Sequence, residues 1–539
     1  MKKLLLVTIL FAFQMAIAQE DALVFFNEKA DVAASLANPI SILTQDALDR
    51  KQLHNTPIDE RDVPVDENLI DVVEAQPGIT VYAKSKWMNS IYVRGSESQI
   101  EALLDLPFVA AIEYMDKSLN FSPGGNGTTP DKFAIENPLN RINYDYGAAL
   151  NQTEMISVDF LHQQDFTGEG MVVAVLDSGF PGVFSNPAFA DAIDEDRIID
   201  TYDFVTRQVN ADGSGSHGSR TFSDIAGLID GDFVGTAPGA SYYLYVTEEG
   251  GAENPVEEAY WVEALERADS LGVDVVNTSL GYQDFDNSSY DHDYEDLDGQ
   301  TTISARGASH ALDKGMLLVT SAGNDGNSFG FVATPADSPG VFTVGAVDSN
   351  ENYASFSSYG PTFDGRIKPD VMAQGEGSAV IDQNGNIDFN NGTSFSSPIM
   401  AGAITSLWQS RPQATNLQIM QIVREASHLF SSPTDLMGYG IPNFEEAYNA
   451  LQILGIEDQL LASQFVMYPN PADNIVSFSI PSFVSQAVVE IYTLAGQRVM
   501  TSEISATNNS VTIDNLASGM YVATVISEDI SNTFKLIKK

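Results

Sequence analysis

Three polar side chains lie directly beside apolar runs of the chain. Asp177 follows the run Met171 to Leu176, His217 lies in a loop rich in glycine and serine, and Ser394 precedes an apolar segment. A serine hydroxyl is a weak nucleophile near neutral pH, so it needs a base within hydrogen-bond reach. A histidine can accept the hydroxyl proton, and a carboxylate can hold the imidazole in the required tautomer. The three residue types are therefore those that nucleophilic acyl transfer requires.

Regular structure must bring these residues together, and the central block of the chain predicts it. Val256 to Leu271 and Ile303 to Asp313 have helical periodicity, whereas Val273 to Asn277 and Met316 to Thr320 are short apolar runs typical of strands. Strands that are apolar without alternation indicate a parallel sheet covered on both faces, which is an α/β fold. Active sites of such sheets lie beyond the carboxyl ends of the strands, where Asp177 stands.

Each of these residues alone has an ordinary structural interpretation. Asp177 could be a turn acid, His217 a surface-loop histidine and Ser394 a helix cap, because these residue types are common in loops. Their order along the chain, together with their positions at the ends of predicted strands and helices, favours the catalytic interpretation over the three separate ones.

Over roughly residues 140 to 450, the chain resembles the subtilisin-like serine proteases. Five motifs in the family's order carry the resemblance: VAVLDSG around Asp177, HGS at His217, VVNTSLG at 275–281, TSAGND at 320–325 and GTSFSSP at 392–398. The resemblance implies a subtilisin-like parallel sheet and a triad of Asp177, His217 and Ser394 that hydrolyses peptide bonds through an acyl-enzyme.

The same resemblance implies further site residues. The Asn324 side-chain amide and the Ser394 backbone N–H would form an oxyanion hole. Segment 279–281, which is Ser279, Leu280 and Gly281, would pair with the substrate backbone as an added strand. Gly323 would line the facing wall of the pocket and Ala333 its floor. The small Ala333 leaves room for a medium or large apolar side chain.

An acidic insertion within this block has the oxygen ligands that calcium prefers. Its carboxylates include Asp284, Asp286, Asp291, Asp293 and Glu295. No spacing among them matches an EF-hand, so a solvated acidic loop remains the alternative to a structural calcium site. The proposed chemistry itself requires no cofactor.

Composition excludes several other classes of function. The 539 residues include 26 Lys+Arg against 74 Asp+Glu, a net charge of −48, which disfavours binding to nucleic acid or anionic lipid surfaces. Cysteine is absent, so thiol catalysis, disulfides and cysteine-based zinc sites are excluded. No two of the six histidines have the i, i+4 spacing of a zinc-binding helix.

The beginning of the chain predicts export. Lys2 and Lys3 precede the apolar run Leu4 to Phe13, and Ala16-Ile-Ala18 is a small-x-small cleavage site. This arrangement is typical of a secretory signal peptide, here residues 1–19, and the apolar run is too short to span a bilayer. No later stretch of the sequence predicts a transmembrane helix.

Residues 20–117 are predicted to form a separate α+β domain. Gly78 to Ala83, Asn89 to Arg94 and Phe108 to Tyr114 have the pattern of strands, and Ser96 offers an N-cap to the helical segment Ile100 to Leu106. The part from 78 to 117 resembles a subtilisin propeptide, which implies an intramolecular inhibitor of the cleft. A breaker-rich linker, 118–133, follows, and we expect maturation by cleavage between about 117 and 145.

The catalytic domain is expected to span residues 134–455, and the tail, 456–539, changes to short β-rich runs. These runs predict a small all-β sandwich. The tail is similar to the C-terminal sorting domain of the type IX secretion system in Bacteroidetes, through Tyr468-Pro-Asn-Pro-Ala472, Leu516-Ala-Ser-Gly-Met-Tyr521 and Lys535-Leu-Ile-Lys-Lys539. The resemblance implies that type IX machinery is a partner and that the product is secreted or displayed on the cell surface.

Taken together, the sequence predicts a secreted serine endopeptidase that acts on proteins or peptides. Two other functions remain open: a catalytically inactive surface protein that keeps the fold for adhesion, and an esterase or acyltransferase that uses the same triad. The tail could also be a carbohydrate-binding module rather than a sorting domain.

Overall fold

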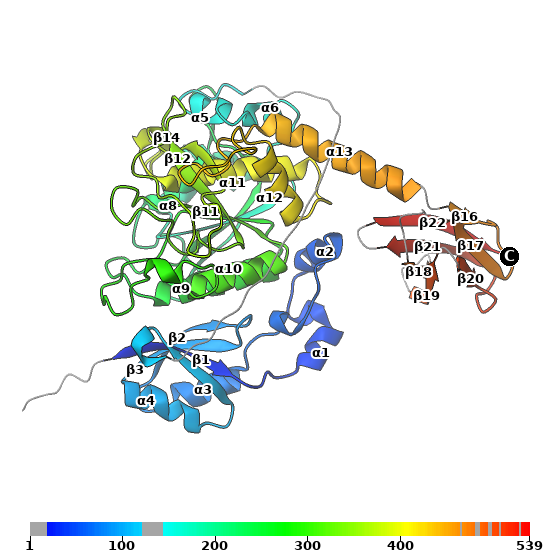
Figure 1. The fold of residues 1–539 in the computed structure, drawn as a ribbon, viewed down its shortest axis with the longest axis horizontal. Helices are drawn as coiled ribbons and strands as arrows, with labels where there is room; N and C mark the ends of the chain where they lie inside the picture. The colour runs from blue at the N-terminus through cyan, green and yellow to red at the C-terminus, as the bar shows by residue number, and fades with distance from the viewer. Residues whose placement is uncertain are drawn as a thin grey trace, which may run out of the picture. The chain divides into compact units, whose positions relative to one another are not determined.

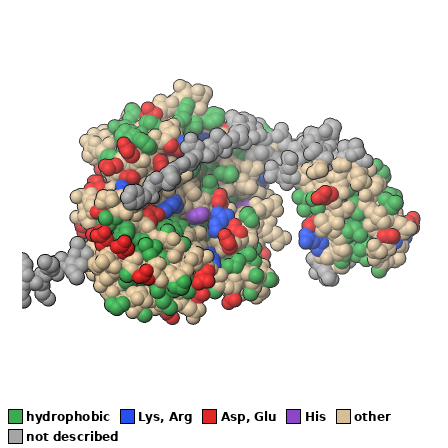
Figure 2. Space-filling model, turned by 60° about the horizontal axis from the view of Figure 1, so that its bottom comes forward, with side chains coloured by type: hydrophobic (Ala, Val, Ile, Leu, Met, Phe, Trp, Pro, Cys, Tyr) green, Lys and Arg blue, Asp and Glu red, His purple; other side chains and the backbone are tan. Residues whose placement is uncertain are grey.

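The computed structural model describes residues 19–120, 144–463, 466–479, 486–493, 498–505, 508–527 and 530–539. The predicted signal peptide, apart from its last residue, lies outside the described residues, as do segment 121–133 of the predicted linker and most of the predicted cleavage region. The chain divides into two compact units, one that ends at Ala447 and one that contains the residues from Tyr448 onward. Figure 2 shows acidic side chains spread over the face that it draws, in keeping with the net charge of −48.

The N-terminal domain, residues 20–120, is built on a four-stranded antiparallel sheet in the order β2-β3-β1-β4. Its strands are β1 (Glu20–Phe26), β2 (Thr80–Ser85), β3 (Ser90–Gly95) and β4 (Val109–Tyr114). Three of the four were predicted. The strand that sequence reasoning missed, β1, lies between β3 and β4, where Ala22 and Val24 are fully buried.

Helices of this domain follow the local capping signals. Ser96 and Gln99 form the capping box that begins α4 (Glu97–Glu101), as the predicted N-cap requires, and a 3₁₀ turn over Ala102–Asp105 continues it. An insertion, residues 27–66, separates β1 from α3 (Glu67–Glu74). It contains α1 (Val32–Ala37), η1 (Pro39–Ser41), α2 (Gln45–Leu53) and η2 (Glu60–Asp62). Sequence reasoning made no structural prediction for it.

The central domain contains a seven-stranded parallel sheet, as predicted, in the order β13-β12-β11-β10-β5-β9-β6. The strands are β5 (Val172–Asp177), β6 (Ile198–Asp203), β9 (Ser241–Val246), β10 (Val275–Thr278), β11 (Leu317–Ser321), β12 (Val341–Val347) and β13 (Val371–Gln374). Most of their side chains are fully buried because helices cover both faces of the sheet.

The helices form two layers about this sheet (Figure 1). One layer holds α9 (Val256–Leu271) and α10 (Ile303–Asp313), which have the predicted bounds, and the N-terminal sheet packs on it through β2. The other holds α8 (His217–Ala226) and α11 (Thr393–Gln409), which contact each other. Smaller elements are α5 (Leu150–Glu154), α6 (Val158–His162), α7 (Ala190–Asp194), α12 (Asn416–Glu425), β7 (Leu228–Ile229), β8 (Phe233–Val234), β14 (Ser378–Ile381) and β15 (Ile387–Asn390).

The second unit contains most of α13 (Phe444–Ser463) and, after this helix, antiparallel strands, in agreement with the predicted β-rich tail. Its strands are β16 (Val466–Tyr468), β17 (Ile475–Ser479), β18 (Gln486–Thr493), β19 (Arg498–Ser505), β20 (Ser510–Thr512), β21 (Gly519–Ser527) and β22 (Ile530–Lys538). They form the sheets β16-β17-β20 and β19-β18-β21-β22 around a core of their own that includes Phe478 and Val489. Within the described residues, no helix combines the length and the apolar character needed to cross a membrane.

Candidate active site

Asp177 and His217 form a hydrogen-bonded pair at the carboxyl edge of the parallel sheet. Asp177 ends β5 and is fully buried, and His217 is the first residue of α8. The imidazole Nδ1 lies 2.9 Å from Asp177 Oδ1 and 3.0 Å from Oδ2. The carboxylate also accepts hydrogen bonds from the Ser178 N–H (2.7 Å) and the Thr221 hydroxyl (3.1 Å). Asp177 is thereby held as an oriented acceptor for the Nδ1 proton of His217.

The pKa of His217 reflects two opposing effects. Burial favours the neutral imidazole and lowers its pKa, but the negative charge and hydrogen bond of Asp177 stabilise the cation. The second effect is the larger, so the pKa of His217 lies above its usual value of 6.5. About a third of the side chain, 35%, remains exposed. His217 therefore has both solvent access and a partner for its cationic form.

Ser394 lies at the start of α11, where a proline shapes the backbone. Pro398 has no N–H, so it cannot make the helical bond to the Ser394 carbonyl four residues earlier. That carbonyl accepts a hydrogen bond from the Ser279 hydroxyl at 2.8 Å instead. In return the Ser394 hydroxyl donates to the Ser279 carbonyl at 3.3 Å. The helix start is thus fixed to the segment that follows β10.

The start of α11 lies next to His217, but the side chains of Ser394 and His217 are not hydrogen-bonded to each other. The ring of Phe395, the next residue after Ser394, lies 5.8 Å from the imidazole, centre to centre. Within the described part of the chain, the Ser394 hydroxyl is bonded to Ser279 and not to His217. Ser394 is 8% exposed, at the surface of the site.

Asn324 follows β11 and contacts the residue before Ser394. Its side-chain oxygen accepts hydrogen bonds from the Thr393 N–H (2.9 Å) and the Thr393 hydroxyl (3.1 Å). These bonds fix the amide plane and direct the Nδ2 group away from Thr393. Among the described residues Nδ2 has no protein acceptor, and the Asn324 side chain is exposed. This Nδ2 group can therefore donate to a ligand.

The predicted substrate-binding residues also come together. Tyr282, directly after Ser279-Leu280-Gly281, donates its N–H to the Thr334 carbonyl at 2.8 Å. A Cβ added at Gly281 would lie 3.2 Å from the Ala333 side chain, so the two residues face each other. Gly323 has a φ of +105°, and a Cβ there would lie 2.8 Å from the Ser358 hydroxyl. Gly281 therefore allows segment 279–281 to approach Ala333 closely, and Gly323 supplies a positive φ and leaves room for Ser358.

The acidic insertion uses its carboxylates for local contacts. Asp291 accepts the Phe285 N–H (2.8 Å), Asp293 and Asp296 form a capping box, and Asp296 pairs with Lys117 of the N-terminal domain (2.5 Å). In the described ranges no group of three or more acidic, histidine or cysteine side chains could hold a metal ion. Calcium binding by Asp284, Asp286, Asp291, Asp293 and Glu295 is therefore not supported by their arrangement.

Two residues beside the pair were not predicted. Thr221 lies one helical turn after His217 in α8, and a spacing of four from a catalytic histidine could have indicated it. Glu248 follows β9, whose last residue pairs with Asp177, and accepts hydrogen bonds from Thr247 and Tyr282. Burial and the nearby negative charge of Asp177 raise the pKa of Glu248 to about 7. Its place after an apolar strand, like that of Asp177, was the available signal.

Known protein families account for most of the chain. The subtilase family profile matches residues 168–448, and the profile of the peptidase S8 propeptide domain of Bacteroidota matches residues 21–132. A secretion system C-terminal sorting domain matches residues 466–539. The chain therefore belongs to the subtilase family of serine proteases, with a propeptide domain before the subtilase domain and a sorting domain after it.

Several curated relatives share this central part. Subtilisin NAT of Bacillus subtilis subsp. natto is 30% identical over 54% of this chain and 69% of its own length. Serine protease AprX of Bacillus subtilis is 28% identical over 53% of this chain and 67% of its own length. The human membrane-bound transcription factor site-1 protease is 29% identical over 56% of this chain, but the match spans 26% of that longer protein.

Among solved structures, the crystal structure of MycP1 from the ESX-1 type VII secretion system is similar. It is 21% identical, covers 59% of this chain and 90% of its own, and has a TM-score of 0.45.

Proposed function

We propose that this protein is a serine endopeptidase in which Asp177, His217 and Ser394 act as the triad. The observation that carries the proposal is the buried Asp177 carboxylate bonded to His217 Nδ1, with the start of α11 beside the imidazole. Membership of the subtilase family supports peptide bonds as the substrate.

In this mechanism Ser394 changes its hydrogen-bond partner. Rotation about its Cα–Cβ bond turns the hydroxyl from the Ser279 carbonyl to His217 Nε2, which takes the proton as the oxygen attacks the peptide carbonyl. The developing oxyanion accepts hydrogen bonds from Asn324 Nδ2 and the Ser394 N–H. His217 then gives the proton to the leaving amine, and the acyl-enzyme is hydrolysed by a water that His217 activates in turn.

The substrate would lie extended along segment 279–281. Backbone hydrogen bonds to this segment add the peptide as a strand, and the side chain next to the scissile bond would enter the space between Gly281, Gly323 and Ala333. The small side chains there are compatible with a medium or large apolar residue at that substrate position.

The flanking regions fit a precursor that is exported and then matures. Residues 1–19 would direct passage across the inner membrane, and residues 20–117 would inhibit the enzyme. A cut between about 117 and 145, a range that includes the linker 118–133, would release a catalytic domain within 134–455. The tail, 456–539, would engage type IX secretion machinery, a role supported by the matching sorting-domain profile.

Internally quenched peptides and short esters, given to the purified protein side by side, test the proposed reaction. Cleavage within the peptides, with new termini identified by mass spectrometry, is the expected result. Turnover of esters alone would make the protein an esterase, and no turnover of either by the matured protein would leave the non-catalytic surface role.

The pH dependence of kcat/KM should show an acidic limb above pH 6.5. Catalysis needs the neutral imidazole, and the raised pKa of His217 means that this form is lost at a higher pH than for an ordinary histidine. The negative charge of Glu248 also raises the pKa of His217. Glu248→Gln should therefore move the acidic limb of the kcat/KM profile to lower pH, by a few tenths of a pH unit. A limb that stays in place would show that Glu248 does not act on His217.

Thr221→Val should lower kcat by about 10-fold, because it removes one charge-assisted hydrogen bond from the Asp177 carboxylate. The Ser178 N–H and His217 still hold the carboxylate, so the loss is partial. Thr221→Ser keeps the hydroxyl and should retain nearly full activity. Equal losses in the two variants would assign the effect to packing of α8 rather than to the hydrogen bond.

A further inference from the structure

The two helices that carry the N-terminal sheet end far from the catalytic pair. In a βαβ unit the helix runs antiparallel to its strands, so its C-terminus lies at the amino edge of the sheet. Gly272 ends α9 just before β10, and Lys314 ends α10 just before β11. Asp177, in contrast, stands at the carboxyl end of β5. The ends of α9 and α10 are therefore at the opposite edge of the sheet from the candidate site.

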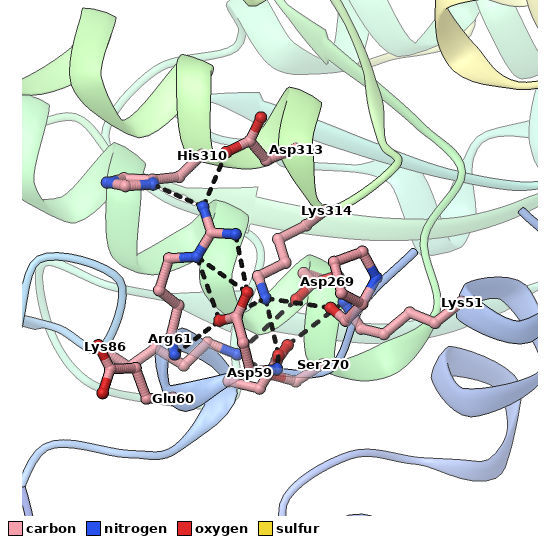
Figure 3. Close-up of polar contacts among 12 residues, drawn as sticks. Lys51, Asp59, Glu60, Arg61, Lys86, Asp269, Ser270, His310, Asp313 and Lys314 are labelled. Atoms are coloured by element: carbon pink, nitrogen blue, oxygen red, sulfur yellow. Dashed lines mark hydrogen bonds and ion pairs between the residues drawn. The ribbon is translucent and has the colours of Figure 1, made fainter. Parts of the chain in front are cut away.

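At this edge, eight charged side chains of two domains form a chain of ion pairs that alternates in charge. Figure 3 labels six of them: Lys51, Asp59, Arg61, Asp269, Asp313 and Lys314. In order they are Arg50, Asp269, Lys51, Asp62, Lys314, Asp59, Arg61 and Asp313. The successive N–O distances are 2.5, 2.6, 3.3, 2.7, 3.0, 2.8 and 2.8 Å. We call this group the ionic cluster. Every ion pair in the cluster joins charges of opposite sign, although the like charge of Arg50 also acts on Lys51 and lowers its pKa.

The middle of the ionic cluster is inaccessible to water. The side chains of Lys51, Asp62, Asp269 and Lys314 are 0% exposed, and that of Arg50 is 4% exposed. A buried ion that loses its partner keeps the cost of desolvation without the compensating attraction. Asp269 is moreover in the last turn of α9, where the helix dipole disfavours an anion. Among the described residues, the cations that stabilise the Asp269 carboxylate all come from the N-terminal domain.

Five of the seven ion pairs join the two domains, whereas Lys51–Asp62 and Asp59–Arg61 lie within the N-terminal domain. One segment supplies all five N-terminal members. The subtilase domain provides Asp269, Asp313 and Lys314, whereas Arg50 and Lys51 come from α2 and the other members from η2 or the residue before it. All members from the N-terminal domain therefore lie in the insertion, residues 27–66. A foreign domain without this pattern would leave both Asp269 and Lys314 buried and unpaired.

The insertion holds the subtilase domain at a further point. His54 stacks on Trp408 of α11, with ring centres 5.5 Å apart and planes at 14°, and its Nε2 lies 2.8 Å from the Pro412 carbonyl. Lys86, from the turn between β2 and β3, adds a hydrogen bond to Ser270 at 2.6 Å. None of these contacts involves Asp177, His217 or the first turn of α11.

We propose that the insertion, residues 27–66, is a second attachment of the propeptide domain, independent of the substrate cleft. Its ionic cluster selects this chain's own propeptide domain and keeps it bound after the connecting segment has been cut. The subtilase domain thus has a docking surface at the amino edge of its sheet. This surface fits a partner segment in which a helix with two adjacent cations is followed by a turn with two carboxylates.

The test uses the full chain with Ser394→Ala, so that its outcome does not depend on the proposed proteolysis. A recognition sequence for an unrelated site-specific protease is placed between residues 121 and 143 and cut after purification. We expect the propeptide domain to stay bound on size-exclusion chromatography. Lys51→Met, which leaves Asp269 and Asp62 without this cation, should raise the dissociation constant at least ~100-fold.

Glu113→Gln is the matched control, because Glu113 pairs with Arg306 of α10 across the same interface but is 33% exposed. Its effect should stay below about 5-fold. Circular dichroism of the uncut chains checks folding. If Lys51→Met does not fold, Asp59→Asn, at the partly exposed part of the cluster, should still weaken retention by about 10-fold. Immediate dissociation of the cut parent chain, or equal effects of the cluster variants and Glu113→Gln, would overturn the proposal.

Discussion

Replacing Ser394 with alanine is expected to lower peptide turnover by at least ~10⁴-fold, because the residual rate then comes only from substrate binding and the oxyanion donors. The variant loses the attacking atom, while the Asp177–His217 hydrogen bond does not involve the residue. A serine-directed fluorophosphonate should label the matured parent protein and not the variant. The labelling requires no knowledge of the natural substrate.

Ser396→Ala provides the matched control for this experiment. Ser396 is in the same helical turn and is fully buried. Within the described part of the chain, its hydroxyl donates to the Thr393 carbonyl of its own helix at 3.0 Å. The control should keep its labelling and its turnover within a few-fold of the parent protein. Labelling that persists in Ser394→Ala would show that another residue is the nucleophile, and the assignment of the triad would then be wrong.

The elements predicted best from the sequence are those that pack on the central sheet and therefore have a regular apolar pattern. Helices α9 and α10 have the predicted bounds because each has its apolar residues at helical spacing and ends at a capping residue. Strand β1 was missed because it begins with Glu20 and Asp21, and the buried Asp21 carboxylate is paired with Arg94. That partner is distant in sequence, so local periodicity could not reveal it.

The candidate site shows the same division. The triad of Asp177, His217 and Ser394 could be predicted from residue types and their order, since each residue lies at the end of a strand or the beginning of a helix. The two hydrogen bonds between Ser279 and Ser394 could not be predicted from the sequence. They form because Pro398 has no N–H to donate to the Ser394 carbonyl, which is therefore available to Ser279. The ionic cluster was equally hidden, since its members come from segments that only the tertiary fold places together.

Asn324→Ala is expected to lower kcat by ~10²–10³-fold with little change in KM, because the oxyanion forms only after the substrate has bound. In the structure the Asn324 oxygen is occupied by Thr393, so the Nδ2 group is the part of the side chain left for the substrate. Kinetics with one peptide substrate, measured at the pH optimum, would give the two parameters separately.

The substitution also removes an acceptor from the Thr393 N–H, and this structural loss must be separated from the catalytic one. Asn324→Asp keeps the oxygen that Thr393 requires but places a negative charge where the oxyanion develops. If Nδ2 stabilises the transition state, Asp should be at least as damaging to kcat as Ala, although it preserves the bond to Thr393. If the residue only supports the start of α11, Asp should instead restore both kcat and the thermal stability of the parent protein. The two substitutions therefore give opposite orders of activity under the two roles, and the order decides between them.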